Sequence, residues 1–389
     1  MFTIVGAAAV GYGLFRFARF VFVTGRWDIV RQNQTLFMVG LYDRDEVWRP
    51  ALALVAMAFI AGLVVGVIGR RQEQTGKGGT PLSPRRRLVD LTRRLWPAVV
   101  GVLAMLMLAE TVTPWLVAGG AVMAAYSGRL AGLRLVPESL LATASIVAAM
   151  LVAMLWMLLQ PVGWDGWGGL MLNVFLAAIS LVLCFPLGVM LALGRRSKLP
   201  LIRAVSTSYI ELFRGVPLLA LLLMANVALG FFVPETFGVF GLFELDLVPG
   251  KVVRAIVVFT LFTAAYVAEI VRGGLQSVPR GQLEAGQAQG MSPFHIMFII
   301  VLPQALRNVI PALVGQFISL FKDTTLAGAA MGFIELLNGA QAATKQPAFS
   351  GQGLFAETLI FVSFIFWVGS FTMSRESQRL EQKLGVGSR

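Results

Sequence analysis

The chain of 389 residues alternates between long apolar runs and short polar segments. An apolar run of about 20 residues is long enough to cross a bilayer as a helix. Runs of this kind are 51–69, 97–118, 138–160, 170–193, 216–233, 252–271, 296–321 and 354–374. The pattern therefore predicts an all-α polytopic membrane protein with about 8–10 helices.

The apolar run at the start of the chain, 1–23, differs from the others because it contains Arg16 and Arg19. It also lacks the small-residue cleavage site of a secretory signal. We interpret it as a tilted or interfacial membrane anchor. A signal peptide that is removed is the alternative.

Composition and charge agree with a membrane protein. Hydrophobic residues make up 57% of the chain and charged residues 13%, against roughly 25% charged residues in a soluble domain. The net charge of +12 could indicate nucleic-acid binding, but the basic residues concentrate in the segments 70–94 and 194–214 and in the C-terminal tail. Short Lys/Arg-rich loops stay on the cytoplasmic side, so we expect all three inside and no nucleic-acid partner.

Two cytoplasmic loops must be separated by an even number of crossings, yet only three obvious runs lie between 70–94 and 194–214. Either one run fails to span, or the stretch 97–128 folds back at Pro114 as two shorter helices. Proline breaks or kinks a helix, and we prefer the fold-back.

A polar segment between two apolar runs, 272–295, is expected inside the cell and carries helix-capping signals. Pro279 suits an early helical position, and a helix Arg280–Gln289 would end at Gly290, which accepts a left-handed cap. Ser292-Pro293 is typical of an N-cap followed by a first helical residue, so a second short helix is predicted up to Pro303. An ordinary solvated loop with caps is the alternative.

This segment resembles the EAA loop of ABC importer permeases. Glu284-Ala285-Gly286, Gly290 and the later Ile300-x-Leu302-Pro303 keep the spacing of that loop. In the family the loop forms a coupling helix that docks into a separate ATPase. The residues that the resemblance assigns to this contact are Gln282, Glu284, Ala285, Gly286, Gly290, Met291 and Ser292. Gly286 departs from the family's alanine, which lowers helix propensity by about 1 kcal/mol.

Three further segments extend the resemblance over roughly residues 167–384. Glu211–Pro217, Ala265–Gly274 and Lys322–Leu326 are similar to motifs of the polar amino-acid branch, with Thr325 where that branch has serine. The nearest likeness is to general or neutral amino-acid importer permeases with an extended N-terminus. The resemblance implies a transmembrane extension 1–165 with a cytoplasmic basic loop 70–94, a five-helix type I permease core 166–375 with a coupling loop 279–303, and a cytoplasmic tail 376–389.

The resemblance also implies partners. We expect an ATP-binding subunit that carries ATP and Mg²⁺, a homologous permease in a heterodimer, a periplasmic amino-acid-binding protein and an amino-acid substrate, in a bacterial inner membrane. The chain has no G-x-x-x-x-G-K-[ST] phosphate loop, so we expect no catalysis and no cofactor in this chain. His295 has no neighbouring metal ligands in sequence, and no metal site is predicted.

Ionisable and polar groups at membrane depth are candidates for the substrate path. Lys322 and Asp323 lie about 20 residues beyond Pro303, so they are expected near the far side of the bilayer. There they either contact the substrate or form a structural pair with each other or with loop residues. Glu269 is expected to pair with Arg272 or Arg214. The weaker candidates for the path are Asn226, Thr324, Thr325, Glu335, Asn338 and Glu110.

Two other functions remain open from the residues alone. An ion-coupled secondary transporter of small solutes would show an inverted repeat, and none is seen. A membrane scaffold or lipid-binding protein would make the 272–295 segment incidental.

Overall fold

The computed structural model describes residues 2–74, 96–109, 112–134, 166–232, 236–239, 243–246 and 250–384, with a few helical residues between 146 and 157. Most of the predicted run 138–160 and of the basic loop 70–94 lies outside the described residues, as does Glu110.

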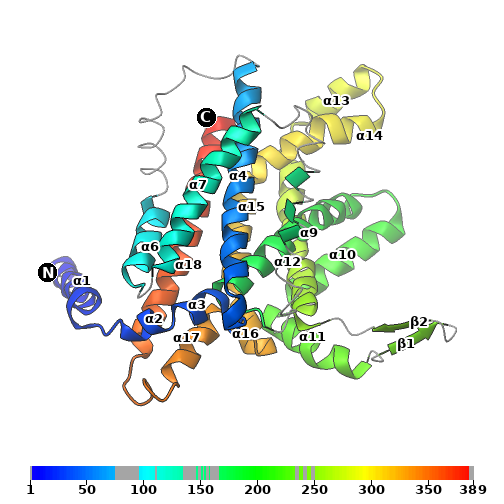
Figure 1. The fold of residues 1–389 in the computed structure, drawn as a ribbon. Helices are drawn as coiled ribbons and strands as arrows, with labels where there is room; N and C mark the ends of the chain where they lie inside the picture. The colour runs from blue at the N-terminus through cyan, green and yellow to red at the C-terminus, as the bar shows by residue number, and fades with distance from the viewer. Residues whose placement is uncertain are drawn as a thin grey trace.

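The described chain is almost entirely helical, which confirms the predicted fold class (Figure 1). A hairpin of two short antiparallel strands, β1 (Thr236–Val239) and β2 (Phe243–Asp246), was not predicted. Seven described helices are long and apolar enough to cross a membrane. They are Val5–Thr24, Arg44–Val67, Thr113–Arg134, Gly169–Arg195, Lys251–Ser277, Pro293–Asp323 and Phe355–Arg379. The last four, with a bent helix pair described below, provide the five spans expected of the core.

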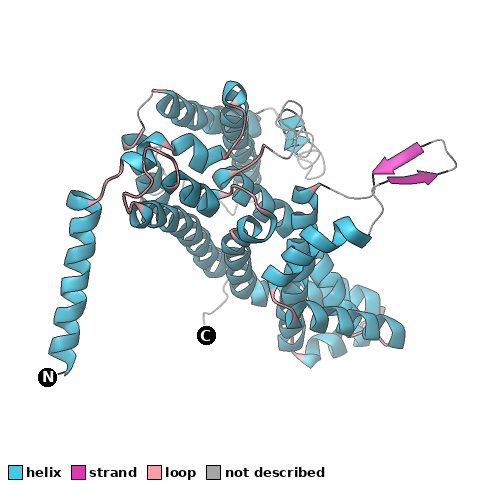
Figure 2. Cartoon of the chain, turned by 90° about the horizontal axis from the view of Figure 1, so that it is seen from below, coloured by secondary structure: helices cyan, strands magenta, loops and turns pink. Residues whose placement is uncertain are grey.

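The N-terminal part begins with a helix that stands apart from the bundle (Figure 2). This helix is α1 (Phe2–Arg19), continued by a π-helical turn η1 (Phe20–Thr24). Two short helices follow, α2 (Asp28–Gln32) and α3 (Gln34–Val39), then the 3₁₀ turn η2 (Arg44–Glu46). The long helices of this part are α4 (Trp48–Gln74) and α7 (Thr113–Arg134), with the shorter α6 (Trp96–Met107) between them in sequence.

Helices α4 and α7 pack against each other through glycines. A Cβ atom on Gly62 or Gly66 of α4 would overlap the carbonyl groups of Ala125 and Arg129 of α7. The contact positions rise together along both helices, so α4 and α7 run parallel, as Figure 1 also shows. The chain must therefore return between them through α6. The predicted break before Pro114 is confirmed, because α6 ends at Met107 and α7 begins at Thr113.

The next helices are α9 (Gly169–Arg195), α10 (Pro200–Gly215), α11 (Leu218–Phe232) and α12 (Lys251–Ser277). The polar segment 194–214, expected as a loop, is mostly the helix α10. Its apolar residues recur at helical spacing among the charged ones, as in an amphipathic surface helix, and the prediction missed this because it used only the charges of the segment. Val216 precedes Pro217 and is extended, with ψ 135°, as the residue before a proline prefers. The chain bends there by 98° between α10 and α11.

The last third of the chain contains α13 (Arg280–Ala288), α14 (Pro293–His295), the π-helical turn η3 (Ile296–Val301) and α15 (Leu302–Asp323). Short helices α16 (Leu326–Met331) and α17 (Leu336–Thr344) precede the long α18 (Phe355–Leu384). Figure 1 shows α13 and α14 at one end of the bundle and α2, α3 and α17 at the other. We call these the α13 end and the α17 end.

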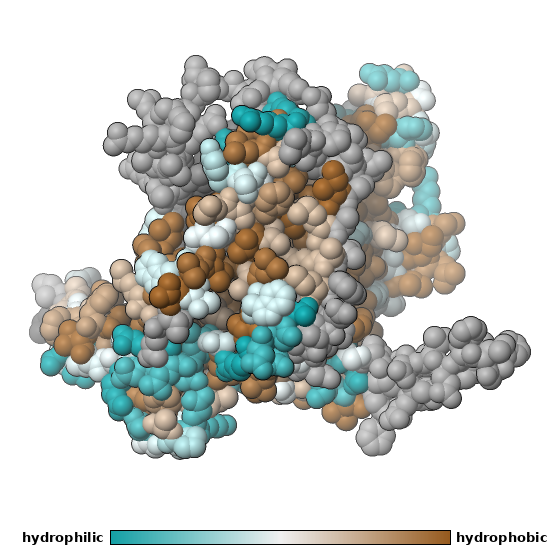
Figure 3. Space-filling view, viewed as in Figure 1, coloured by the Kyte–Doolittle hydropathy of each residue, from teal (hydrophilic) through white to brown (hydrophobic). Residues whose placement is uncertain are grey.

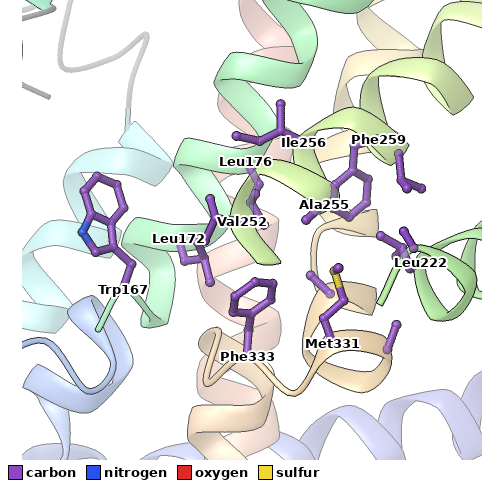
Figure 4. Packing of buried hydrophobic residues seen from close by; sticks show 14 of the residues in the cluster. Trp167, Leu172, Leu176, Leu222, Val252, Ala255, Ile256, Phe259, Met331 and Phe333 are labelled. Atoms are coloured by element: carbon purple, nitrogen blue, oxygen red, sulfur yellow. The ribbon is translucent and has the colours of Figure 1, made fainter. Parts of the chain in front are cut away.

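Buried apolar side chains form clusters at both ends of the bundle. The cluster toward the α17 end joins α9, α11, α12 and α16 and includes Leu172, Leu222, Phe259 and Met331 (Figure 4). The cluster toward the α13 end joins α9, α12, η3 and α15. Between the ends, the surface carries a broad apolar belt (Figure 3), as expected for a protein surrounded by lipid.

Candidate coupling elbow and substrate path

The polar segment 279–295 forms an elbow that projects at the α13 end (Figure 1). Helix α12 ends at Ser277 because Val278 precedes a proline and is extended, with ψ 125°. Pro279 is the N-cap of α13. The prediction that Pro279 is an early helical residue is therefore off by one position.

The C-terminus of α13 closes at Gly290, as predicted. Gly290 has φ +72°, a left-handed conformation that glycine adopts without strain. The N–H of Met291 donates to the carbonyl of Gly286 at 3.1 Å, and the N–H of Gly290 donates to that of Gln287 at 2.9 Å. These two bonds are the Schellman arrangement of a helix end, so the turn at Gly290 is well defined.

The predicted cap at Ser292 is also confirmed. Its Oγ accepts the backbone N–H of His295 at 3.3 Å and lies 2.7 Å from the Nδ1 atom of the same residue. The predicted end of this second helix at Pro303 is wrong, since α14, η3 and α15 form one continuous span of 31 residues. The wider π-helical turn accommodates the missing N–H of Pro303, and the side chain of Gln304 donates to the carbonyl of Ile300 at 2.9 Å.

The residues that sequence assigned to coupling differ in exposure. Those that are exposed are Gln282, Glu284, Ala285, Gly290 and Ser292, while Met291 is half-buried. Glu284 makes no ion pair among the described residues. Gly286 is buried, and a Cβ atom there would lie 2.9 Å from Cγ1 of Ile296. Gly286 therefore lets α13 approach η3, and its effect is one of packing more than of helix propensity.

An ion-pair cluster lies on the bundle near the elbow. The Glu269 carboxylate on α12 accepts hydrogen bonds from Arg272, at 2.7 and 2.9 Å, and from Arg195 at the end of α9. Arg214 of α10 is 3.8 Å away. Both predicted partners are present, and Arg195 was missed because it is distant in sequence. The cluster joins three helices where each approaches the α13 end.

A buried polar hub at the α17 end consists of Asn173, Thr324 and Glu335. Asn173 of α9 donates to Thr324 Oγ1 at 3.0 Å and to Glu335 Oε2 at 3.3 Å, and its Oδ1 accepts the N–H of Leu336 at 3.0 Å. All three hub residues are 0% exposed. Sequence reasoning missed Asn173, which lies inside an apolar run.

Glu335 also caps α17. Its carboxylate accepts the N–H groups of Leu337 at 2.9 Å and Asn338 at 2.8 Å. Burial raises the pKa of this carboxyl, while its N–H donors oppose the shift. The contacts of Thr324 and Glu335 are thus internal and hold α9, α15 and α17 together.

The other predicted path residues donate no side-chain hydrogen bond to a hub side chain within the described part of the chain. Lys322 is exposed, and Asp323 is half-buried. Neither side chain has a hydrogen bond or ion pair among the described residues, and no ion pair joins the two. Thr325 Oγ1 donates to the carbonyl of Lys322 at 2.9 Å. Asn226 of α11 donates to the carbonyl of Ala330 at 3.0 Å, which links α11 to α16.

Comparisons with known proteins identify the family to which the chain is similar. A family model described as the binding-protein-dependent transport system inner membrane component matches residues 184–385. The chain is 32% identical over 362 residues to the inner membrane amino-acid ABC transporter permease protein YhdY of Escherichia coli K12, covering 93% of this chain and 78% of that protein. It is 34% identical over 366 residues to the glutamate/glutamine/aspartate/asparagine transport system permease protein BztC of Rhodobacter capsulatus, covering 92% and 78%.

A solved structure, that of an amino acid ABC transporter with histidines, is 28% identical, with a TM-score of 0.46 over 54% of this chain and 90% of that one. The family model begins at residue 184, whereas both relatives align over more than nine tenths of the chain. The two relatives therefore share most of the N-terminal part with this chain.

Proposed function

Because the chain belongs to the binding-protein-dependent transport system inner membrane components and is an amino-acid ABC importer permease without catalysis of its own, we propose that the elbow 279–295 is its contact with a separate ATP-hydrolysing subunit. The family membership gives no support to an ion-coupled secondary transporter.

The shape of the elbow carries this proposal. The elbow projects from the bundle, exposes Gln282, Glu284 and Ser292, and is fixed at its turn by the two hydrogen bonds around Gly290. Beyond Ser292 it continues as one helical span to Asp323. A partner shifts a conformational equilibrium only if it binds the two states differently. An ATPase that binds the elbow differently in the presence and in the absence of ATP would move this span.

The proposed coupling role implies the other subunits of the transporter. ATP and Mg²⁺ bind to the ATPase, and this chain binds neither. A homologous permease completes the translocation path as a heterodimer, and a periplasmic binding protein delivers the amino acid. The α13 end and the C-terminus then lie in the bacterial cytoplasm, and the α17 end faces the periplasm.

Lys322 and Asp323 are the proposed contacts for the substrate. An amino-acid zwitterion carries a carboxylate and an ammonium group, and these two side chains offer the opposite charges at the end of α15. Their lack of an ion pair within the described chain leaves both available to a ligand.

Two pairs of variants test the elbow in the complete transporter. Gly290→Ala forces a side chain into the left-handed conformation at a cost of about 1–2 kcal/mol. Gly273→Ala on α12, outside the elbow and with nothing within 4 Å of an added Cβ, is the matched control. We expect amino-acid uptake to fall in Gly290→Ala and to stay normal in Gly273→Ala.

The second pair tests charge. Glu284→Lys is expected to weaken nucleotide-dependent association with the ATPase, whereas Gln378→Lys, on exposed residue 378 of α18, is not. Unchanged association and uptake in both Glu284→Lys and Gly290→Ala would refute the coupling role.

The substrate contact is tested by Asp323→Asn. We expect a higher KM for uptake with an unchanged basal rate of ATP hydrolysis. An unchanged KM would refute the assignment.

A further inference from the structure

A strap of the N-terminal part, Gly25–Val47, lies across the α17 end of the permease core. Ile29, Val30 and Phe37 of this strap are 0% exposed. They pack in one apolar cluster with buried residues of α17 and α18, among them Leu336, Ala340, Phe361 and Val362. The strap is therefore seated in the core by its apolar side.

Polar contacts fix the strap further. The side chain of Gln346 donates to Oδ1 of buried Asn33 at 2.7 Å, and the N–H of Arg26 donates to the buried Glu357 carboxylate at 3.2 Å. Gly40 has φ +70°, and a Cβ there would overlap the backbone of Gly168. These contacts give the strap a fixed position relative to α9, α17 and α18.

The outward side of the strap is charged. Asp28 and Arg31 of α2 are exposed, and so is Lys345 after α17. None of the three forms an ion pair among the described residues. Figure 3 shows the hydrophilic surface that gathers at this end, below the apolar belt. We call the exposed residues of the strap and of the loop 345–353 the platform.

The buried side of the strap holds the helices together, and the charges of Asp28, Arg31 and Lys345 on the opposite side are exposed to a partner. Fixed charges on a rigid surface steer a partner and add specificity, and a pre-organised surface loses little entropy on binding. The strap also reaches the hub, because Gly40 meets the backbone of Gly168 and the N–H of Gly169 donates to the carbonyl of Ile334, the residue before Glu335. The hub contains Thr324, the residue after the proposed substrate contact Asp323.

We propose that the platform is the docking surface for the substrate-loaded binding protein, an inference that rests on the proposed function. The family is described by its dependence on a binding protein, which must deliver substrate at the end opposite the elbow. The strap precedes residue 184, where the family model begins. Docking on the strap would therefore be a property of permeases that carry this N-terminal part.

The test uses the complete transporter in proteoliposomes, with ATP hydrolysis measured against the concentration of loaded binding protein. The variants are Asp28→Arg with Arg31→Glu, and Lys345→Glu. We expect the concentration for half-maximal stimulation to rise about 10-fold in the double variant. The rise should shrink at high salt, while basal hydrolysis and thermal stability stay unchanged. Lys198→Glu, an exposed position before α10, is the matched control and should behave as the unaltered chain.

A half-maximal concentration that changes by less than about 2-fold in folded double-variant transporter would overturn the docking surface. This failure is distinct from a failure of the coupling role. Elbow variants abolish the link between ATP and uptake at every concentration of binding protein, whereas platform variants recover full stimulation when the binding protein is in excess.

Discussion

Replacing Asn173 by leucine should destabilise the protein, because the substitution removes a set of buried hydrogen bonds. Asn173 is fully buried and makes three hydrogen bonds that join α9 to the loop and helices around Thr324 and Glu335. Leucine keeps the same branching and number of side-chain heavy atoms, but it is bulkier and can replace none of these bonds. The variant therefore removes all three bonds at once, and any overpacking adds to the loss.

The expected loss follows from the groups that remain. The N–H of Leu336 loses its acceptor while buried, at about 1–3 kcal/mol, and Glu335 loses a donor to its carboxylate, at about 1.5–3 kcal/mol. The apolar side chain returns part of this by burial, about 1 kcal/mol. We expect a net loss of about 3 kcal/mol, or roughly 6 °C in Tm at about 2 °C per kcal/mol.

The single cysteine provides the assay. Cys184 lies on α9 with Asn173 and is 0% exposed. A thiol-reactive fluorescent dye will therefore label the purified chain only as it unfolds on heating. The control is Asn308→Leu, at an exposed asparagine with one hydrogen bond, to Ser277 at 3.0 Å. It should cost less than about 1 kcal/mol.

Equal shifts in Tm for the two variants, or a shift below about 2 °C for Asn173→Leu, would refute the reasoning. Either result would mean that the buried hydrogen bonds of the hub contribute no more than an exposed one. Thr324→Val should lose stability less than additively in the Asn173→Leu background, because the two residues share a bond.

Three other outcomes are expected. Gly128→Leu should separate α4 from α7 and lower the stability by about 1–3 kcal/mol or more in a melting experiment. The control Gly119→Leu, where an added Cβ meets nothing within 4 Å, should be tolerated. Equal melting temperatures for the two variants would contradict the glycine contact. Glu269→Gln should leave Arg214 and Arg272 without their anion and Arg195 with only Glu211, which is 3.6 Å away. Uptake should therefore fall, and uptake equal to that of the unaltered transporter would contradict a role for the cluster. Gly286→Ala should change stability by less than about 1 kcal/mol, because gained helix propensity offsets the displacement of Ile296, and a loss above about 2 kcal/mol would show that Ile296 cannot move.

Local chemistry explains what could be predicted from the sequence. The caps at Gly290 and Ser292 depend on residues within five positions, and the structure contains both. The break before Pro114 is equally local. Prolines alone are less informative: Pro217 and Pro279 follow extended residues and interrupt helices, while Pro303 follows a π-helical turn and does not.

Residues that act across the fold left no local signal. Asn173 has its partners 151 to 163 positions away in the chain, and it is one polar residue in an apolar run. Arg195 is 74 positions from Glu269. Gly286 was judged by helix propensity because its neighbour Ile296 is brought close only by the turn at Gly290. Such contacts require the positions of several helices at once.

If an ATPase moves the elbow, the helical span from Pro293 to Asp323 would act as a lever, with Pro311 near its middle as a point where the helix can bend. Its 31 residues extend for about 46 Å at about 1.5 Å per residue. A tilt of about 5° around its centre moves each tip by about 2 Å in opposite directions. A movement of the helix beside Ser292 would therefore produce the opposite movement beside Thr324. One end of the translocation path would close as the other end opens.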